Sequence, residues 1–282
     1  MYPMRTRFAP SPTGYLHLGH VVNAIVTWGV TRATGGQVWL RIEDHDRIRC
    51  RPHFEAALLD DLAWLGFVPD AGLSPLVRQS DRVAIYEAAL ARLRDSHRVY
   101  VCDCSRKRVG GERYDGQCRA RGLTETAGTG LRVRLDDGEE TFVDRRLGPQ
   151  RQCPADDCGD VLVRDRDGHW TYQFAVTVDD IDQAITHVIR GEDLLSSTGR
   201  QLQLMRLLGH TAPPRYLHHP LLHGADGAKL SKSAGDTGVR DLRAAGLSAA
   251  EVIGRAAHLS GLTPTAAPVA ASDVHVLFSG WR

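Results

Sequence analysis

Lysine is rare in this sequence, yet two of its three lysines lie within the five-residue stretch KLSKS, at Lys229 and Lys232. Apart from Lys107, every other basic residue is an arginine. A lysine ammonium is a compact charge on a flexible stem and can follow a phosphate that moves during a reaction, whereas the rigid arginine fork suits a fixed clamp. Glycines on both sides of the stretch let the chain bend toward a ligand. KLSKS therefore predicts a phosphate-binding loop, although alone it is equally consistent with a solvated loop.

A second stretch with chemical potential, FAPSPTGYLHLGH, lies near the N-terminus and carries His17 and His20. The two histidines are three residues apart at the start of a predicted helix, so they share one helix face. Unpaired N–H groups and the helix dipole make a helix N-terminus favourable for phosphate, and Gly19 leaves room for a nucleotide beside the backbone. Two surface histidines beside a turn would give the same pattern.

The residues around these stretches predict an α/β fold with a parallel sheet. Five elements are expected in the first part of the chain: a strand within 5–14, a helix over 17–36, a strand over 37–44, and helices over 51–67 and 80–100. Ser80 is the expected N-cap of the last of these helices. Because parallel strands need crossover connections, which helices usually provide, this order of elements favours a parallel sheet.

The rest of the chain is expected to insert a subdomain and then complete the sheet. From residue 101 to about 160 the sequence is rich in Gly, Arg and Cys. The elements expected after it are a hairpin over 161–180 that turns at Asp167–Gly168, a strand over 184–195, a helix over 197–209, a strand from Tyr216, a helix over 248–262 and a loose Ala/Pro/Ser-rich tail. The expected units are two halves of a catalytic domain at 1–100 and 161–235, an insertion at 101–160, and a C-terminal segment at 236–282.

The composition excludes several classes of protein. A formal net charge of +1 over 282 residues gives no global signal for nucleic acid, so any RNA contact requires a local patch. There is no run of about 18 apolar residues and no apolar signal core at the N-terminus, so a cytoplasmic protein without a membrane span is expected. Six cysteines in so long a chain do not predict disulfides. Cys50 looks incidental, and Cys153 with Cys158 is too small a set for a separate metal site.

The other three cysteines form a candidate metal site in the insertion. Cys102 and Cys104 make a C-x-C pair, and Cys118 follows within YDGQC. Zinc in proteins takes four tetrahedral ligands and binds thiolates well, so a fourth ligand is needed. Tyr114 is the preferred candidate for it, ahead of His97. Three free cysteines in a loop are the alternative, but a Gly/Arg-rich insertion offers little apolar core to hold them.

Together, HLGH and KLSKS, in that order and about two hundred residues apart, resemble the two signatures of class I aminoacyl-tRNA synthetases. RFAPSPTG and RIED resemble the glutamyl/glutaminyl branch more narrowly. The resemblance covers about residues 5–235 and implies a Rossmann-like catalytic domain that binds ATP between the signatures, with Mg²⁺ accompanying the triphosphate. The residues that it assigns to ATP are His17, Gly19, His20, Lys229, Ser231 and Lys232.

Glutamate carries two carboxylates and one ammonium, so a specific pocket needs cations and an anion. By resemblance, Arg7 and Arg190 are the carboxylate clamps and Glu43 of RIED is the ammonium partner, while Tyr172 is a hydrogen-bonding wall. An ion pair at a strand end and a tyrosine packed in a hairpin are the structural alternatives. The same glutamate site is expected to include Phe8, Ala9, Pro10 and Ser11.

The chain also resembles a shortened branch of this family, the glutamyl-queuosine tRNA(Asp) synthetases. Glutamyl-tRNA synthetases continue into a helical anticodon-binding domain, whereas about fifty residues follow Ser233 here, too few for an independent core. The pattern C-x-C…Y-D-G-x-C is typical of the shortened branch, in which zinc is structural. The resemblance implies transfer of L-glutamate to the queuosine base in the anticodon loop of tRNA(Asp). His45 and His20 depart from the residues common in the branch without changing the expected pocket.

The expected first step is attack of the glutamate α-carboxylate on the α-phosphate of ATP, which gives glutamyl-adenylate and pyrophosphate. Lys232 is expected to stabilise the transferring phosphate and the leaving pyrophosphate, and Lys229, His17 and His20 are expected to assist. No protein nucleophile is needed, because alignment of the reactants and neutralisation of charge account for the catalysis.

Three other functions share parts of this pattern. They are a short glutamyl-tRNA synthetase that charges a tRNA 3′ end, a nucleotidyltransferase of the same superfamily, and a non-catalytic RNA- or metal-binding module. An arginine-rich stretch in the insertion predicts an RNA-facing patch, although a solvated loop accounts for it equally well. The arginines of this stretch are Arg106, Arg108, Arg113, Arg119 and Arg121. A monomer is expected.

Overall fold

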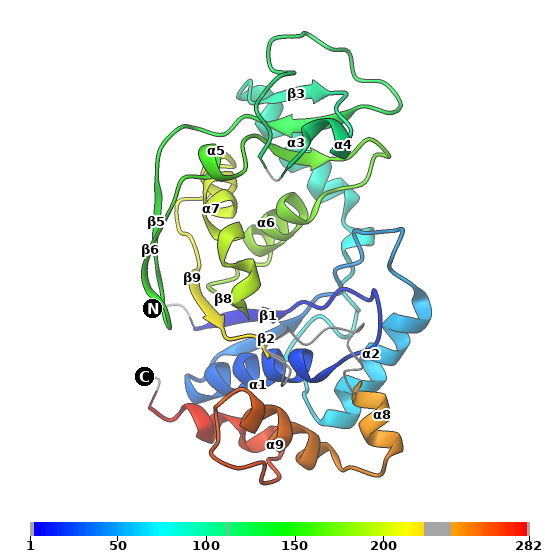
Figure 1. Ribbon diagram of the computed structural model, residues 1–282, viewed down its shortest axis with the longest axis vertical. Coiled ribbons are helices and arrows are strands. Elements are labelled where there is room, and N and C mark those ends of the chain that lie inside the picture. Colours follow the sequence, from blue (N-terminus) through cyan, green and yellow to red (C-terminus); the bar gives the residue numbers. More distant parts are fainter. Residues whose placement is uncertain (1–2, 112, 223–237, 281–282) are drawn as a thin grey trace.

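The computed structural model describes residues 3–111, 113–222 and 238–280 of the chain. Figure 1 shows these residues as two parts along the long axis, with the first strands, the first helix and the C-terminal helices in the lower part. A small antiparallel sheet lies at the upper end. Within the described ranges, every helix is too short or too polar to cross a membrane.

The first strand, β1 (Arg5–Phe8), pairs in parallel with β2 (Gln37–Leu40), and α1 (Leu18–Ala33) connects the two. α1 forms because its long apolar run is buried against the strands and against the C-terminal helices. Beyond its end, Gly35 has a φ of 69°, which glycine adopts without strain. The predicted order of strand, helix and strand and the parallel pairing are confirmed for this region.

Two helices follow, α2 (Pro52–Leu65) and α3 (Val83–Asp95), as predicted. A proline opens α2, where its missing N–H has no partner to lose. The prediction that Ser80 caps α3 is wrong, because Ser80 lies within a 3₁₀ turn, η1 (Gln79–Asp81), that precedes the helix. Its backbone N–H donates instead to the Asp44 carboxylate at 2.8 Å, which ties this turn to the residues that follow β2.

A second, mostly parallel sheet completes the core. Its four strands are β5 (Glu140–Asp144), β6 (Gly148–Gln152), β8 (His187–Gly191) and β9 (Arg215–His219). Their order is β6-β5-β9-β8, and η2 (Glu192–Ser197) with α7 (Thr198–Leu207) crosses from β8 to β9. Thr186, just before β8, exchanges hydrogen bonds of 2.8 and 2.9 Å with the Arg5 backbone of β1, so the two sheets adjoin. The α/β prediction is confirmed, and β5 and β6 of the expected insertion join this sheet.

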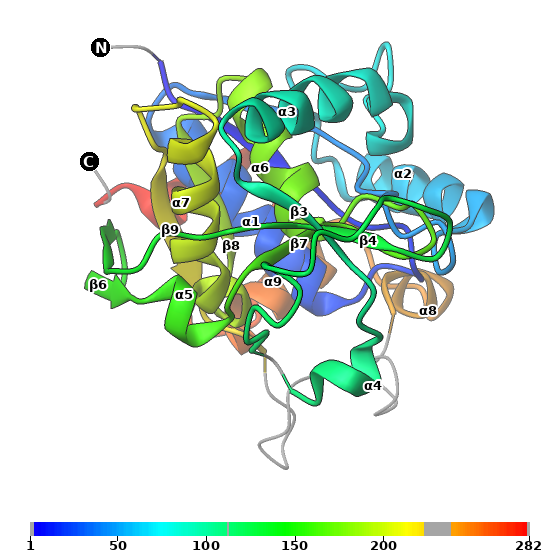
Figure 2. The same ribbon diagram turned by 90° about the horizontal axis from the view of Figure 1, so that it is seen from above.

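The sheet at the upper end is three-stranded and antiparallel, with the order β3-β4-β7, and is made of β3 (Val99–Cys102), β4 (Gly130–Val133) and β7 (Val161–Arg164). The short helix α4 (Arg106–Val109) projects away from this sheet (Figure 2). Another short helix, α5 (Pro154–Asp157), leads into β7. The cysteine-rich stretch therefore lies at the edge of a small sheet that shares an apolar core with α3 and α7.

The predicted hairpin over 161–180 is wrong beyond its turn. A tight turn does follow β7, but a single bridge between Arg164 and Trp170 is all the pairing that results among the described residues. α6 (Tyr172–Asp182) then replaces the expected second strand. All residues of 174–180 are buried, which suits a helix enclosed by other elements. A short apolar run of this kind does not distinguish a strand from a buried helix by periodicity.

The C-terminal residues are packed, contrary to the expectation of a loose tail. The last elements are α8 (Val239–Ala244), α9 (Ala249–Leu259) and the 3₁₀ helix η3 (Ala271–Phe278). η3 lies against α1 (Figure 1). Val274 and Phe278 are buried, and a Cβ at Gly29 of α1 would meet the Phe278 ring at 2.3 Å. Burial of these apolar side chains against α1 stabilises a segment whose composition is otherwise loop-like.

Candidate active site

The HLGH turn forms the N-terminus of α1. His17 is the N-cap residue, and its Nδ1 accepts a hydrogen bond of 3.1 Å from the Gly19 N–H. The His17 N–H donates to Nδ1 of His20, also at 3.1 Å, so the two histidines cap the helix reciprocally. Their ring centroids are 4.0 Å apart. A Cβ on Gly19 would lie 2.9 Å from the His17 ring, so the cap itself requires glycine here.

The lysine segment begins and ends near this helix. The three KLSKS residues assigned to ATP, Lys229, Ser231 and Lys232, lie outside the described residues. Gly238, which follows 223–237, forms a β-bridge with His17. On the preceding side, Leu222 is buried in the core that contains α1. The chain therefore enters and leaves 223–237 close to α1, as a site shared by HLGH and KLSKS would require.

A pocket of about 270 Å³ opens beside α1, and six of the eight residues assigned to glutamate line it. These six are Arg7, Ala9, Ser11, Glu43, Tyr172 and Arg190. They come from β1, the loops after β1 and β2, the first turn of α6, and β8. Asn23 also lines the pocket and lies three residues after His20 on α1, so the same helix contributes to the HLGH turn and to the pocket.

Phe8 and Pro10, the other two residues assigned to glutamate, do not line the pocket. The Phe8 ring is buried against Trp28, with centroids 5.2 Å apart, and the Pro10 carbonyl accepts a hydrogen bond of 3.1 Å from the Glu43 N–H. Both residues therefore support the loop after β1 without lining the pocket. Tyr172 reaches the pocket from a helix, not from a hairpin, and burial raises the pKa of its phenol.

One buried network of charges holds Arg7 and Glu43. Asp180 of α6 accepts hydrogen bonds from Arg7 Nε at 3.0 Å and from Arg41 at 2.9 Å. Arg41 also donates to Glu43 at 2.9 Å, and its Nε lies 3.6 Å from Asp179. Burial alone disfavours a charged guanidinium, but these three carboxylates raise the pKa of the fully buried Arg41. The two pocket groups of opposite charge are thus joined through Arg41 and Asp180.

Arg190 is also buried, but its hydrogen-bond partners among the described residues are neutral. Its Nε donates to Nε2 of His218 at 3.0 Å, and its terminal nitrogens donate to Gln201 at 2.8 Å and Thr198 at 2.9 Å. No carboxylate within the described ranges forms an ion pair with it. A buried cation without a counter-ion is unfavourable, so Arg190 makes this pocket attractive to an anion.

Cys102, Cys104 and Cys118 come together in the upper part, and all three are buried with their sulfur atoms within 4.8 Å of one another. The sulfurs of Cys104 and Cys118 are 3.5 Å apart, and the Tyr114 hydroxyl lies 3.6 Å from the Cys102 sulfur. Four ligands at zinc–sulfur distances lie about 3.8 Å apart in a tetrahedron. The donor set therefore fits one zinc ion. His97 is exposed and is not part of this group.

The surroundings of the sulfurs differ. Burial raises thiol pKa values, but hydrogen bonds from Tyr114 and from Arg132, whose Nε lies 3.3 Å from the Cys102 sulfur, bring the pKa of Cys102 below its usual value. Burial and the neighbouring thiols instead raise the pKa of Cys104 to about 12. A bound cation would favour the thiolate form at both positions.

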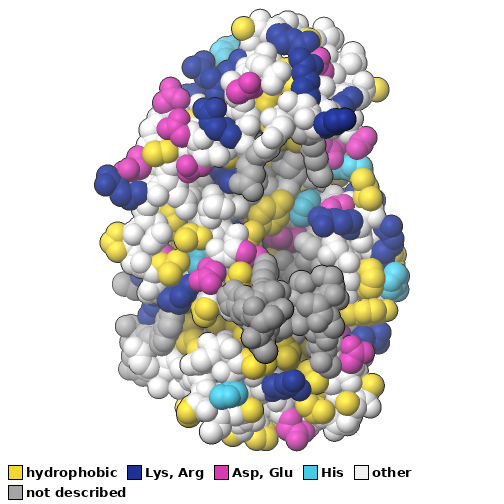
Figure 3. Space-filling model, in the orientation of Figure 1, with side chains coloured by type: hydrophobic (Ala, Val, Ile, Leu, Met, Phe, Trp, Pro, Cys, Tyr) yellow, Lys and Arg dark blue, Asp and Glu magenta, His cyan; other side chains and the backbone are white. Residues whose placement is uncertain are grey.

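The arginines expected to face RNA are largely paired within the protein. Arg119 donates to the buried Asp160 at 2.5 and 2.6 Å, and Arg121 donates to Asp103 at 2.6 and 2.9 Å. Arg113 donates to a backbone carbonyl at 2.7 Å. Figure 3 shows basic and acidic side chains interspersed over the upper end of the molecule. Ion pairing therefore accounts for much of this arginine-rich stretch.

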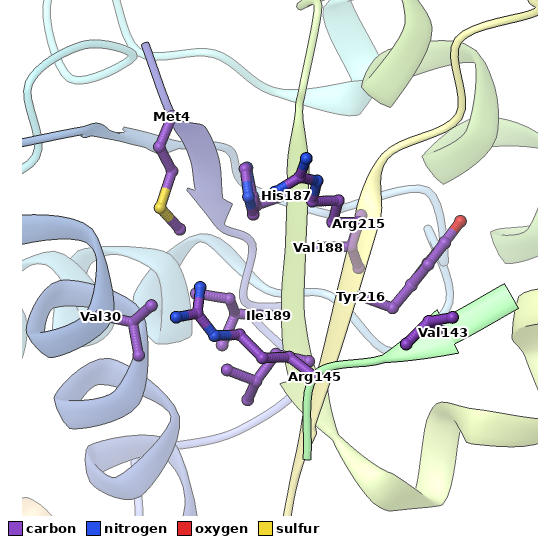
Figure 4. Close-up of a pocket in the computed structure, with 10 residues that line it drawn as sticks. Met4, Val30, Val143, Arg145, His187, Val188, Ile189, Arg215 and Tyr216 are labelled. Atoms are coloured by element: carbon purple, nitrogen blue, oxygen red, sulfur yellow. The ribbon is translucent and has the colours of Figure 1, made fainter. Parts of the chain in front are cut away.

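A larger pocket, of about 440 Å³, has a different character. Figure 4 shows Met4 and Val30 on one side of it and Arg215 and Tyr216 of β9 on the other. Its lining is mostly apolar and includes none of the described residues assigned to glutamate or ATP, although Ile189 lines both pockets. The smaller pocket is the better candidate because charged groups converge there.

Sequence reasoning missed Asn23 and Leu194 in the pocket, and Arg41 and Asp180 behind it. The adjacent acids Asp179 and Asp180 were a usable signal, because carboxylates inside an apolar stretch need cationic partners when they are buried. Asn23 and Leu194 gave no comparable signal, since a single amide in a predicted helix and a leucine at the end of a predicted strand are ordinary.

Comparison with known proteins agrees with this geometry. Residues 3–268 match the family of tRNA synthetases class I (E and Q), catalytic domain. A glutamyl-Q tRNA(Asp) synthetase of Symbiobacterium thermophilum is 42% identical over 297 residues, which cover 96% of this chain and 91% of the relative. Another, of Burkholderia mallei, is 47% identical over 245 residues, 82% of this chain and 81% of the relative.

Solved structures give the same fold. A glutamate tRNA ligase from Elizabethkingia meningosepticum, crystallised with its amino acid, has a TM-score of 0.81 and 26% identity. The match covers 97% of this chain but 64% of that ligase, so the chain spans less than two thirds of its length. Methionyl-tRNA synthetase of Mycobacterium tuberculosis, with a TM-score of 0.61 and 15% identity, shares the fold.

Proposed function

This chain belongs to the class I tRNA synthetases for glutamate and glutamine, and we propose that it activates L-glutamate with ATP and transfers it to the queuosine base of tRNA(Asp). The enzyme is a ligase. The relatives named glutamyl-Q tRNA(Asp) synthetase align over most of both chains, which supports this branch over the longer glutamate tRNA ligase.

The observation that carries the glutamate assignment is the set of charges in the 270 Å³ pocket. Arg190 is a buried cation without a carboxylate partner among the described residues, and Arg7 adds a second guanidinium. Glu43 supplies the anion in the same pocket. A ligand with two carboxylates and one ammonium matches these groups in kind and number. We assign the carboxylates to Arg7 and Arg190, the ammonium to Glu43, and a hydrogen bond to Tyr172.

ATP is assigned to the N-terminus of α1 and to KLSKS. An oxygen of the glutamate α-carboxylate attacks the α-phosphorus, the bond to the bridging oxygen breaks, and pyrophosphate leaves. His17, Gly19, His20, Lys229 and Lys232 surround the phosphates, with Ser231 in the same loop, and Mg²⁺ accompanies the triphosphate. The bridge between His17 and Gly238 supports this assignment, because Gly238 follows shortly after the lysines in the chain.

In the second step a hydroxyl of the queuosine base attacks the carbonyl carbon of the adenylate, and AMP leaves. The names of the relatives support this acceptor. Because Arg119 and Arg121 are paired with acids, we do not assign the RNA surface to the whole arginine-rich stretch. A cytoplasmic monomer fits a reaction on tRNA.

A structural zinc is assigned to Cys102, Cys104, Cys118 and Tyr114. The proximity of three buried sulfurs supports it. Cys118→Ser should lose the zinc that elemental analysis finds in the purified protein and should lower the melting temperature. Cys50→Ser, outside the cluster, should keep both. Equal zinc contents in the two variants would contradict the assignment.

Exchange of labelled pyrophosphate into ATP tests the activation step. We expect exchange that depends on glutamate and not on glutamine or aspartate. Exchange without any amino acid would indicate a nucleotidyltransferase. No exchange, with or without tRNA, would indicate a module that has kept the fold and lost the chemistry.

A further inference from the structure

Two buried residues behind Arg190 have no role in the proposed function so far. They are His218 of β9 and Asp144 of β5, which are at most 1% exposed. His218 Nε2 accepts the hydrogen bond of 3.0 Å from Arg190 Nε. On the other side of the ring, His218 Nδ1 lies 2.7 Å from Asp144 Oδ2. A chain of two hydrogen bonds therefore connects Asp144 to the guanidinium that faces the pocket.

The partners of the imidazole fix its proton. The Asp144 carboxylate is an acceptor, so Nδ1 carries the hydrogen and donates it. Arg190 Nε–H is a donor, so Nε2 must offer its lone pair. Neutral imidazole with the proton on Nδ1 is the form that satisfies both contacts. The other neutral tautomer would set two N–H groups against each other at Nε2 and leave Nδ1 without a proton for the carboxylate.

Asp144 is itself firmly placed. Its Oδ1 accepts from the backbone N–H groups of Arg146 at 3.0 Å and Leu147 at 2.9 Å, and its Oδ2 also accepts from the His218 N–H at 2.9 Å. Burial disfavours the charged carboxylate, but hydrogen bonds from His218 and from these backbone groups bring the pKa of Asp144 below its usual value. The carboxylate is therefore ionised and fixed before any ligand binds.

The three residues lie on adjacent strands. Arg190 is directly opposite His218 in the parallel register of β8 and β9. Asp144 is opposite Tyr216 where β5 joins β9, two residues before His218. The chain of hydrogen bonds therefore runs across the sheet, and its far end comes from the segment between the antiparallel strands of the upper part.

We infer that Asp144 and His218 are positioning residues that set the direction of the Arg190 guanidinium, and thereby the recognition of a substrate carboxylate. The inference rests on the proposed glutamate pocket. A guanidinium has five N–H groups, and three of those on Arg190 are held by His218, Gln201 and Thr198. One N–H on each terminal nitrogen remains for a carboxylate, and its direction is set by the bonds already made.

This arrangement makes carboxylate recognition sensitive to protonation of His218. The groups that face the ring are Asp144 from β5, Arg190 from β8, Arg7 from β1, Thr198 from α7 and the stacked Tyr216 ring on β9. Burial and the two arginines lower the pKa of His218, and Asp144 opposes them. The ring is therefore neutral at physiological pH, and acidification that protonates Nε2 removes the acceptor for Arg190. KM for glutamate should therefore rise as the pH falls through the lowered pKa of His218.

Asp144→Asn is the direct test. It keeps the shape of the side chain, but its amide nitrogen must face either the turn N–H groups or the two N–H groups of His218. Either orientation sets donors against donors, so the imidazole is no longer held firmly in place. In the glutamate-dependent exchange, we expect KM for glutamate to rise about tenfold or more, with KM for ATP and the rate at saturating glutamate unchanged. The matched control is Glu140→Gln, another buried carboxylate on β5, which pairs with Arg206. It should leave KM for glutamate unchanged.

A second measurement is made on the wild-type protein, and a variant is used only to assign the signals. The ¹⁵N shifts of the His218 ring at pH 7, assigned with His218→Gln, should show a proton on Nδ1 and none on Nε2. A proton on Nε2 would overturn the inference even if Asp144→Asn does not fold. A folded Asp144→Asn variant whose KM for glutamate equals that of the wild type would also overturn the inference. Failure of the wild type to respond to glutamate would instead refute the proposed function.

Discussion

At the scale of single residues, the two arginines that line the pocket differ in their partners: Arg7 is paired with a carboxylate, whereas Arg190 has neutral partners among the described residues. Arg7 shares the Asp180 carboxylate with Arg41, and Arg41 also pairs with Glu43. Arg190 has hydroxyl, amide and imidazole partners. Because its charge is buried and uncompensated within the described part of the chain, a substrate carboxylate gains more at Arg190 than at Arg7.

Replacement of Arg190 should therefore affect glutamate binding strongly. Arg190→Gln should raise KM for glutamate roughly hundredfold, because a charge-assisted bidentate contact is lost in a buried pocket. KM for ATP should not change. Arg200→Gln, a more exposed arginine on α7, serves as the control. Equal KM values for glutamate in the two variants, measured by pyrophosphate exchange, would contradict the assignment.

The scarcity of lysine supplies another test at this scale. Lys232→Ala should lower the rate of exchange at saturating substrates by about a hundredfold or more, since one cation that stabilises the transferring phosphate is removed. KM for glutamate should change little. Lys107→Ala removes the lysine outside KLSKS and should leave the rate unchanged. A fall in glutamate affinity that matches the fall in rate would argue against the role.

The limit of sequence reasoning is visible in the same residues. Arg7, Glu43 and Arg190 could be named because they lie in recognisable motifs, and the structure brings them to one pocket. Arg41 and Asp180 are 139 positions apart, and although Arg41 opens the RIED motif, neither residue was assigned a role. Their pairing depends on α6 lying close to the residue that follows β2, which no spacing along the chain reveals.

At the scale of elements, the contact between α2 and α8 contains a buried carboxylate, that of Asp61, which is only partly compensated by a cation. Asp61 of α2 is fully buried, its carboxylate oxygens have no hydrogen-bond partner within the described residues, and Arg240 of α8 lies 3.8 Å away. Burial raises the pKa of Asp61 to about 6. Because an unfolded aspartate titrates near about 4, ionisation of Asp61 opposes folding, and stability falls as the pH rises from about 4 to 6.

Asp61→Asn should therefore stabilise the protein at neutral pH. The free energy of unfolding in urea should rise by about 1–2 kcal/mol at pH 7, and most of this gain should vanish near pH 4.5, where the wild-type carboxyl is protonated. Asp60→Asn removes a neighbouring carboxylate that pairs with Arg243 at 2.9 Å and should give no gain. A gain of equal size at both pH values would rule out this explanation.

The elements also show which patterns could be interpreted. Strand–helix–strand units were predictable because their apolar faces have clear periods and glycines mark their ends. α6 was not, because its seven consecutive buried residues carry no period that separates helix from strand. η3 was not, because Val274 and Phe278 are ordered by the groove at Gly29, a feature of the folded α1 surface.

At the scale of the whole molecule, the chain order brings distant segments to one place. β1 and β8 adjoin through hydrogen bonds between Arg5 and Thr186, so residues from both halves line one pocket. Gly238 pairs with His17, so the segment that contains KLSKS ends at the first helix. The α/β class could be predicted from sequence, whereas the meeting of the two signatures stays a prediction because KLSKS lies outside the described residues. The contribution of β5 to the support of Arg190 could not be predicted, because it depends on where an inserted segment joins the sheet.

The acceptor is the most direct test of the central claim, which is glutamate transfer to a modified base. Labelled glutamate, ATP and Mg²⁺ are incubated with tRNA(Asp) that carries queuosine, with the same tRNA that lacks it, and with tRNA(Glu). We expect label on the queuosine-containing tRNA(Asp) alone. The same label should appear when the 3′ end of this tRNA has been blocked beforehand by periodate oxidation. Label on tRNA(Glu), or label on tRNA(Asp) that does not depend on queuosine, would contradict it.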